Sequence, residues 1–203
     1  MARIQHNAAA EALSSFLKPW HESLTVPRKS QETVLRRLLS GYQQTDYGRK
    51  HGAEKITTAE EFTASFPIVT YKDLAPVIEQ VMQGNFGALL PKPSVNWAMT
   101  RGTTGKSKFV PMTETDLEQR VACGARAILN YVHRSQRYDI LEGSDLNLNF
   151  PSVVGTRMMG SKEITYGYSS GIYARYNAER MQINMVPEQD EIDALGGGIT
   201  KRD

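Results

Sequence analysis

The fold and the chemistry of this chain are read most directly from one stretch, Thr100-Arg101-Gly102-Thr103-Thr104-Gly105-Lys106-Ser107-Lys108. Apolar residues alternate before the stretch and Phe109-Val110 follows it, so it is predicted to be a tight loop between two strands. Glycines bring backbone amides close to an anion, while hydroxyls and lysines add hydrogen bonds and positive charge. These residue types in this order favour a loop that holds a phosphate chain.

Two kinds of phosphate loop compete for this stretch. The P-loop of nucleotide hydrolases requires glycine at position 100, where the chain has Thr100, and a helix that opens at Lys106. Phe109-Val110 and Pro111 favour an extended segment there instead. The loop of adenylate-forming enzymes, [ST]-[ST]-G-T-T-G-x-[SP]-K, lies between strands and departs from this sequence only at Arg101, where a small hydroxyl residue is usual. A Gly/Thr-rich hairpin turn without a ligand is the third interpretation.

A longer resemblance runs through the residues that precede the loop. It is carried by three segments in a fixed order: Gln44–Gly52 (QTDYGRKHG), Ile56–Phe62 (ITTAEEF) and Phe66–Leu74 (FPIVTYKDL). Gly84 and the turn Leu89-Leu90-Pro91 complete the approach to the loop. Together with the loop, this order resembles the N-terminal part of the auxin-responsive Gretchen Hagen family of acyl acid amido synthetases. The resemblance is close from Gln31 to Thr113 and looser elsewhere.

The resemblance implies an α/β fold with helices packed on a mixed β-sheet, as the N-terminal part of the large domain of an adenylate-forming enzyme. Residues 1–203 would be an incomplete adenylating, nucleotide-binding domain with a helical lead-in at residues 1–55, and the family's C-terminal domain would be absent. The family's second nucleotide motif and its acidic ribose-binding motif are not found in the sequence. A helix-start pattern at Thr200–Asp203 likewise predicts that the natural chain continues.

The function implied by the resemblance is ATP-dependent activation of a carboxylic acid as an acyl-adenylate, followed by transfer to an amine or amino acid. The implied ligands are ATP with Mg²⁺, a small carboxylic acid and the amine acceptor. Lys106 and Lys108 are the candidate catalytic residues, because their charge would neutralise the leaving pyrophosphate. The candidate ATP-binding residues are Thr100, Gly102, Thr103, Thr104, Gly105 and Ser107, and no residue is assigned to a metal. The alternative is a truncated, non-catalytic nucleotide-binding module that needs a partner or the missing remainder.

Composition limits the function classes. The chain has 203 residues, of which 40% are hydrophobic and 23% charged, as in ordinary globular proteins. A net charge of +2 gives no case for nucleic acid, and no apolar run approaches the roughly 18 residues of a membrane span. The four histidines lack metal-site spacing, and the single cysteine, Cys123, excludes an internal disulfide and is expected to pack inertly in a helix. We therefore expect a cytoplasmic protein.

Helical patterns dominate the first part of the chain. Helices are predicted over residues 8–17 and 31–42, the second with Ser30 as its N-cap. Thr58 and Thr70 each begin a capping box, [ST]-x-x-[DE], and so open two further helices.

The second part of the chain is predicted to be mixed. Thr113 caps a longer helix whose buried stripe is Leu117, Val121, Ala125, Ile128 and Val132. Leu146, Leu148 and Phe150 alternate with Asn147 and Asn149, which indicates a strand that ends at Pro151. The segment Tyr166–Tyr173 either lines a pocket or forms a surface loop. A short helix is expected at residues 187–195, with Pro187 as its first residue.

Overall fold

The computed structural model describes residues 2–100, 107–159, 161–181 and 183–195. The chain opens with helices, α1 (Ala2–Thr25), α2 (Pro27–Tyr42), α3 (Asp46–Lys50) and α4 (Ala59–Ser65), with a short 3-10 turn η1 (Ala53–Lys55) between the last two. The two predicted helices are confirmed, and both are longer than the pattern indicated. Ser30 is not the N-cap of α2, because the helix already begins at Pro27; its hydroxyl donates to the Val26 carbonyl oxygen instead (3.1 Å).

Both predicted capping boxes are confirmed. The Thr58 hydroxyl accepts from the Glu61 amide (3.1 Å) and the Glu61 carboxylate accepts from the Thr58 amide (3.2 Å), which fixes the start of α4. The Asp73 carboxylate accepts from the amide of Thr70 (2.7 Å) at the start of α5 (Tyr71–Met82). Such local exchanges satisfy amides that a helix N-terminus leaves unpaired.

A mixed four-stranded sheet follows α5 and the 3-10 turn η2 (Phe86–Ala88). Its strands, in spatial order, are β2 (Lys108–Met112), β1 (Asn96–Thr100), β5 (Lys162–Tyr168) and β4 (Gly155–Met159). β1 pairs antiparallel with β2 and parallel with β5, while β5 pairs antiparallel with β4. The predicted α/β class and the mixed sheet are therefore confirmed.

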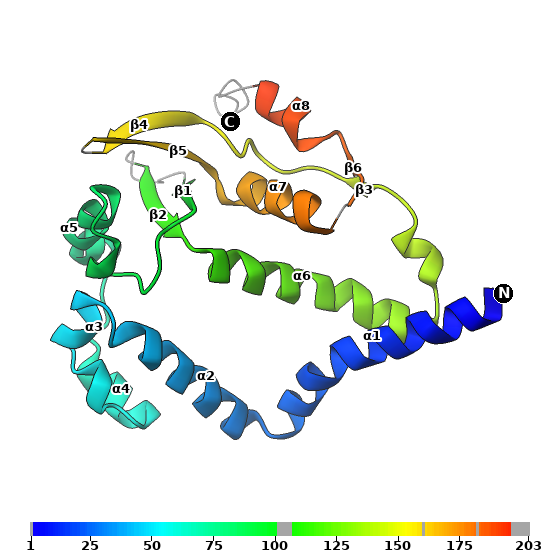
Figure 1. Cartoon of the computed structure of the whole chain (residues 1–203), viewed down its shortest axis with the longest axis horizontal. Coiled ribbons are helices and arrows are strands. Elements are labelled where there is room, and N and C mark those ends of the chain that lie inside the picture. The colour runs from blue at the N-terminus through cyan, green and yellow to red at the C-terminus, as the bar shows by residue number, and fades with distance from the viewer. Residues whose placement is uncertain (1, 101–106, 160, 182, 196–203) are drawn as a thin grey trace.

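The central strand β1 is covered on both of its faces. Trp97 packs against Ile78, Val81 and Met82 of α5, while its neighbour Ala98 faces a separate cluster. That second cluster joins β1 and β2 to α6 (Glu114–Ser135) and α7 (Ser169–Met181) and contains Met112, Leu117 and Ile172. In Figure 1, α5 accordingly lies to the left of β1 and β2, with α6 and α7 to the right.

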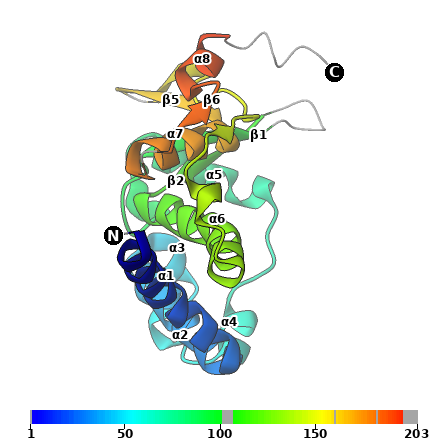
Figure 2. The same cartoon turned by 90° about the vertical axis from the view of Figure 1, so that its right-hand side faces the viewer.

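The second half of α6 packs against α1 rather than against the sheet. Val132 and Leu129 contact Leu13 and Leu17, and Figure 2 shows the resulting stack from α1 and α2 through α6 and α7 to α8 (Gln189–Ala194). Because the packing partner changes, a different side of the helix is buried in its second half than in its first. The predicted stripe is therefore wrong at Ile128, whose exposed fraction is 46%.

The segment after α6 corrects a further prediction. After the 3-10 turn η3 (Tyr138–Leu141), the strand β3 covers only Asp145–Leu146 and pairs with β6 (Met185–Val186). The predicted strand is therefore too long, and the burial here does not follow the apolar residues, because Asn147 is buried while Leu148 is 80% exposed. The cause is a hydrogen bond: the Asn147 side-chain amide donates to Gln189 Oε1 (3.2 Å), so the amide side chain faces inward.

The prediction for Cys123 in α6 is also corrected. Its side chain is exposed rather than packed, because it lies on the outer face of the helix.

The predictions for the C-terminal part of the chain have different outcomes. Tyr166–Tyr173 is the end of β5 and the first turn of α7, so the surface-loop interpretation is wrong. The predicted short helix is confirmed as α8, but it starts after Glu188, whose side chain is part of a capping box, and Pro187 lies outside it. The pattern at Thr200–Asp203 lies outside the described residues. Across the part of the chain that the structure describes, no helix has both the length and the apolarity needed to cross a bilayer.

A polar network ties α7 and α8 to the segment that precedes β4. The Asp193 carboxylate accepts from the Ser152 amide (2.6 Å), from Arg175 Nη2 (2.6 Å) and from Gln189 Nε2 (2.9 Å), and it also hydrogen-bonds to the Ser152 hydroxyl. Burial by itself would raise the pKa of the Asp193 carboxyl, but these hydrogen bonds together hold that pKa below its ordinary value. The network fixes the C-terminal layer against the sheet.

Candidate functional site

The predicted phosphate loop joins β1 to β2. Thr100 and Lys108 are register partners at the loop end of this antiparallel pair, so the two ends of the loop are held side by side. Gly102, Thr103, Thr104, Gly105 and Lys106 lie outside the described residues, as does Arg101. The structure places Thr100, Ser107 and Lys108, and all three are exposed.

The secondary structure on either side of the loop distinguishes the two phosphate-loop interpretations. Strand β2 begins at Lys108 and pairs with β1 along its length, to Met112 opposite Asn96. A P-loop requires a helix at this position, so that interpretation is wrong. The strand–loop–strand arrangement is the one expected for an adenylate-forming loop.

Tyr71 contacts the C-terminal arm of the loop. Its hydroxyl donates to the Phe109 carbonyl oxygen (3.2 Å) and accepts from the Phe109 amide (3.0 Å). Its ring also lies under the Lys108 ammonium, with Nζ 5.5 Å from the ring centroid. The sequence reasoning included Tyr71 in a family motif and missed its contact with the loop, since nothing in a linear pattern places residue 71 beside residue 109.

A second basic side chain, from the opposite edge of the sheet, reaches the same arm. The Arg157 guanidinium of β4 lies over the Phe109 ring, 5.6 Å from its centroid, and Tyr166 meets that ring edge-on at 5.0 Å. Arg157 and Lys108 have no carboxylate partner among the described residues. The arm of the loop is thus flanked by two cations that are available to an anion.

The beginning of α6 is anchored next to this hairpin. The Tyr176 hydroxyl donates to Glu114 Oε1 (2.7 Å), and Arg180 hydrogen-bonds to the same carboxylate. Burial and this hydrogen bond raise the pKa of Tyr176 to about 12. Because only Thr113 separates Glu114 from the end of β2, the contact connects α7 to the end of the hairpin.

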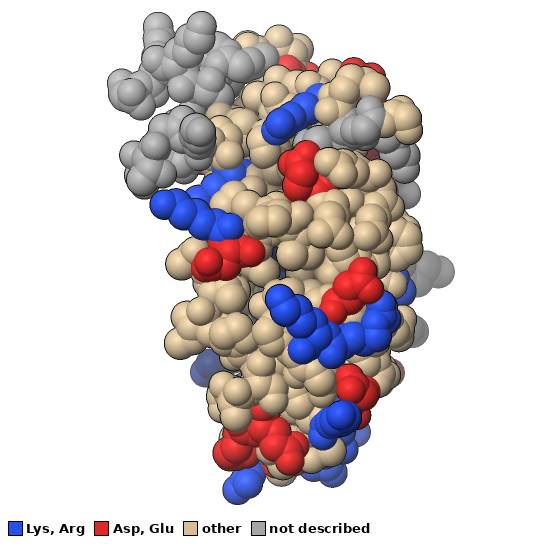
Figure 3. Space-filling view, turned by 90° about the vertical axis from the view of Figure 1, so that its left-hand side faces the viewer, with Lys and Arg blue, Asp and Glu red and all other residues tan. Residues whose placement is uncertain are grey.

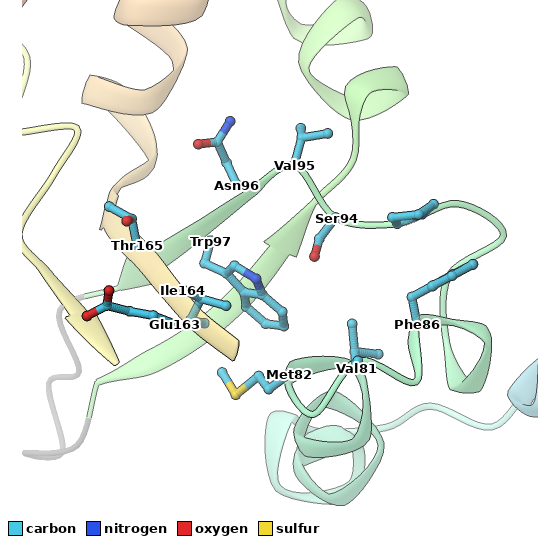
Figure 4. Close-up of a pocket in the computed structure, with 12 residues that line it drawn as sticks. Val81, Met82, Phe86, Ser94, Val95, Asn96, Trp97, Glu163, Ile164 and Thr165 are labelled. Carbon is cyan, nitrogen blue, oxygen red and sulfur yellow. The ribbon is translucent and has the colours of Figure 1, made fainter. Parts of the chain in front are cut away.

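A cavity of about 310 Å³ lies at the other end of β1 from the loop. Figure 4 shows Trp97 and Ile164 pointing toward Val81 and Met82, with Glu163 directed away from them. Glu163 is the one charged residue among those that line this cavity, so the cavity does not suit a phosphate chain. The predicted site is the hairpin end, not this hollow.

Neither the charge on the face shown in Figure 3 nor the metal-ligating side chains of the described residues indicate a second site. Figure 3 shows basic and acidic side chains mixed over the side of the molecule where α3, α4 and α5 lie. Within the described ranges, no group of three or more His, Cys, Asp or Glu side chains is arranged to hold a metal ion.

Comparison with protein families gives one match that covers most of the chain. The model described as "GH3 family N-terminal domain" matches residues 17–192. The match includes the hairpin, α5 and the whole sheet.

Curated relatives are similar over shorter stretches. A jasmonoyl–L-amino acid synthetase of Nicotiana attenuata, JAR4, is 31% identical over 126 residues, which are 61% of this chain and 21% of the relative. A probable indole-3-acetic acid-amido synthetase of Oryza sativa, GH3.2, is 36% identical over 92 residues, or 44% of this chain and 15% of the relative. The chain thus spans about a fifth of the length of the curated relatives that it matches.

A solved structure shares the fold. The acyl acid amido synthetase AtGH3.15, solved in complex with 2,4-DB, aligns with a TM-score of 0.69 at 20% sequence identity. The alignment covers 85% of this chain and 29% of that protein. The helices and mixed sheet described above therefore match the N-terminal region of this amido synthetase fold.

Proposed function

Because this chain belongs to the GH3 family, we propose that it is the phosphate-binding part of a ligase that joins a small carboxylic acid to an amine in an ATP-dependent reaction. Its relatives are named as a jasmonoyl–L-amino acid synthetase and an indole-3-acetic acid-amido synthetase, and both names describe amide-forming ligases. The observation that supports the proposal most directly is the strand–loop–strand hairpin, in which Thr100 and Lys108 pair next to the loop.

The chemistry divides into two steps. A carboxylate oxygen of the acid attacks the α-phosphorus of ATP, the bond to the β-phosphate oxygen breaks, and pyrophosphate leaves with an acyl-adenylate remaining. The amine nitrogen then attacks the acyl carbon, AMP leaves, and an amide forms with loss of the amine proton. A carboxylate is already a nucleophile, so the first step needs no general base. Positioning and charge neutralisation therefore carry most of the catalysis.

The loop residues have distinct roles in this scheme. Backbone amides over residues 102–105 and the hydroxyls of Thr103, Thr104 and Ser107 donate to phosphate oxygens. Lys106 and Lys108 neutralise charge on the leaving pyrophosphate. Two features fit an anion at this end of the sheet: β1, which is packed on both faces, holds Thr100 beside Lys108, and the Lys108 ammonium has no carboxylate partner among the described residues.

Mg²⁺ is proposed to arrive with the nucleotide. This ion binds phosphates through few protein carboxylates and retains several waters, so a dedicated cage of acidic side chains is not required. It would add charge neutralisation to that of the lysines. The acid and the amine that relatives use, jasmonate, indole-3-acetate and amino acids according to their names, are properties of those proteins. For this chain we propose only the shared class of substrates, and a cytoplasmic location stays a prediction.

The alternative is a nucleotide-binding module without catalytic activity of its own. The chain matches 21% of one relative and 29% of a solved family member. A non-catalytic nucleotide-binding module that acts with a separate polypeptide would also span this little of the fold. Such a module binds ATP but does not exchange pyrophosphate into ATP when a carboxylic acid is added.

Pyrophosphate exchange tests the proposal. The protein carrying this chain, purified from its native source, is assayed for acid-dependent exchange of labelled pyrophosphate into ATP over a panel of carboxylic acids. The same protein with Lys108→Met is expected to lose about a hundredfold or more of the rate, because a charge directed at the leaving group is removed. Lys92→Met is the control, since Lys92 is an exposed lysine that precedes β1. Equal rates in the Lys108→Met variant and the unchanged protein would contradict the proposal.

A further inference from the structure

Strand β2 lies at one end of the sheet, and its outer backbone groups would be left without a strand partner. The order β2-β1-β5-β4 places no other described strand beside it. Phe109 nevertheless has both its outward amide and its carbonyl oxygen satisfied, by the single hydroxyl of Tyr71 (3.0 and 3.2 Å). At an exposed edge, such groups normally bind water or another chain. The hydrogen bonds to Tyr71 are therefore a specific side-chain contact that pairing within the sheet does not require.

The position of Tyr71 is set by contacts of α5 other than those with Phe109 and Lys108. Tyr71 is the first residue of α5 and follows the capping box that Thr70 forms with Asp73. Further along the helix, Ile78 and Val81 pack against Trp97 of β1 and so hold α5 against the sheet. The hydroxyl therefore acts as a fixed point, and β2 is held against it.

The same side chain also contacts the lysine at the end of the loop. The Lys108 ammonium lies 5.5 Å from the centroid of the Tyr71 ring, within the range of a cation–π attraction. A lysine side chain has four rotatable bonds, and an exposed ammonium would otherwise sample many positions. One residue thus restrains the backbone of β2 through its hydroxyl and the charge of Lys108 through its ring.

We propose that Tyr71 is a positioning residue that fixes the C-terminal arm of the phosphate loop and holds the Lys108 ammonium where it meets the nucleotide. The inference rests on the proposed function and extends it to a residue outside the loop. It also gives a physical reason for two separate family segments: Phe66–Leu74 supplies the anchor, and Thr100–Lys108 supplies the loop that the anchor holds. Preorganised charge costs no reorganisation when a phosphate arrives.

Three substitutions, used singly and in combination, separate the roles of the hydroxyl, the ring and the lysine. Tyr71→Phe removes the two hydrogen bonds and keeps the ring, Tyr71→Leu removes both, and each is also combined with Lys108→Met. Tyr173→Phe is the matched control, because the Tyr173 hydroxyl donates one bond of similar length (3.2 Å, to the Arg120 carbonyl oxygen) away from β2. Amide hydrogen exchange at Phe109 and the affinity for Mg·ATP are measured for each variant.

The expected pattern differs for the two measurements. Tyr71→Phe should speed exchange of the Phe109 amide about tenfold or more, leave the amide of Val81 in α5 unchanged, and weaken Mg·ATP binding about three- to tenfold. Tyr71→Leu should weaken binding further. With Lys108→Met in place, Phe and Leu at position 71 should give the same affinity, since the ring then has no ammonium to hold. A purely structural role would instead give the same ratio in both backgrounds.

The outcomes distinguish this inference from the proposed function. If Lys108→Met weakens Mg·ATP binding while both Tyr71 variants bind as the unchanged chain does, the positioning role is overturned and the proposed function stands. Unchanged exchange at the Phe109 amide in Tyr71→Phe would also overturn the positioning role. If Lys108→Met binds Mg·ATP normally, the proposed function fails, and the role given to Tyr71 at the nucleotide fails with it.

Discussion

Replacing Asp193 by asparagine should destabilise the chain strongly for so small a change of shape. The carboxylate accepts hydrogen bonds from Ser152, Arg175 and Gln189, and its side chain is 12% exposed. Asparagine keeps one acceptor oxygen and turns an NH₂ group toward groups that are themselves donors. Hydrogen bonds to a charged group contribute about 1.5–3 kcal/mol each. Losing one or two of them, with a discount because Arg175 is 36% exposed, gives about 2–3 kcal/mol.

Urea and thermal unfolding measure this loss. For a domain of this length, about 2–3 kcal/mol corresponds to a fall in Tm of roughly 4–12 °C. Asp190→Asn is the matched control, because Asp190 pairs with the same Arg175 at 2.5 Å but has a side chain that is 77% exposed. Exposed pairs contribute about 0.2–1 kcal/mol. The reasoning is refuted if Asp193→Asn unfolds within about 0.5 kcal/mol of the unchanged chain, or if both variants lose the same free energy.

Three other perturbations test separate parts of the fold. Gly48→Ala should cost about 2–3 kcal/mol or more in urea unfolding, since a Cβ there would stand 2.0 Å from the Tyr42 carbonyl oxygen; Gly87→Ala, with its nearest neighbouring atom at 3.8 Å, should be close to neutral. Thr58→Ala should lower the free energy of unfolding by about 1 kcal/mol through the lost cap of α4, and an unchanged midpoint would count against that cap. The raised pKa of Tyr176, about 12, means that its stabilisation is complete below the unfolded value near 10 and is lost as pH rises toward 12. Tyr176→Phe should flatten the pH profile of stability in that window, and an equally steep profile would contradict the assignment.

Local signals in the sequence were sufficient for the elements that depend on neighbours in the chain. The capping boxes at Thr58 and Thr70 are exchanges between residues three apart, and both occur as expected. The hairpin was predicted from alternating apolar residues before the loop at residues 100–108 and from Phe109-Val110 after it, and the two strands pair as expected. A pattern of this range determines where an element starts, and it determines little about what the element later touches.

The predictions that proved wrong, and the contact that was missed, involve residues that are distant in the sequence. The stripe on α6 fails at Ile128 because the helix changes its partner from the sheet to α1 partway along. The burial near β3 does not follow the apolar residues, because Asn147 finds Gln189, 42 residues later, and is buried with it. The contact between Tyr71 and the loop arm crosses 38 residues. None of these pairings has a signature in either segment alone.

Binding of Mg·ATP to the ¹⁵N-labelled chain, followed by NMR, tests the central claim most directly, because it reports both affinity and location. The proposed function predicts saturable shifts at the amides of Thr100, Ser107 and Lys108 and over residues 101–106. It also predicts that Lys108→Met needs a clearly higher Mg·ATP concentration to produce those shifts, while Lys92→Met leaves the affinity unchanged. Saturable binding that shifts amides elsewhere, such as those lining the cavity beside Trp97, or no shifts at millimolar Mg·ATP, would contradict it.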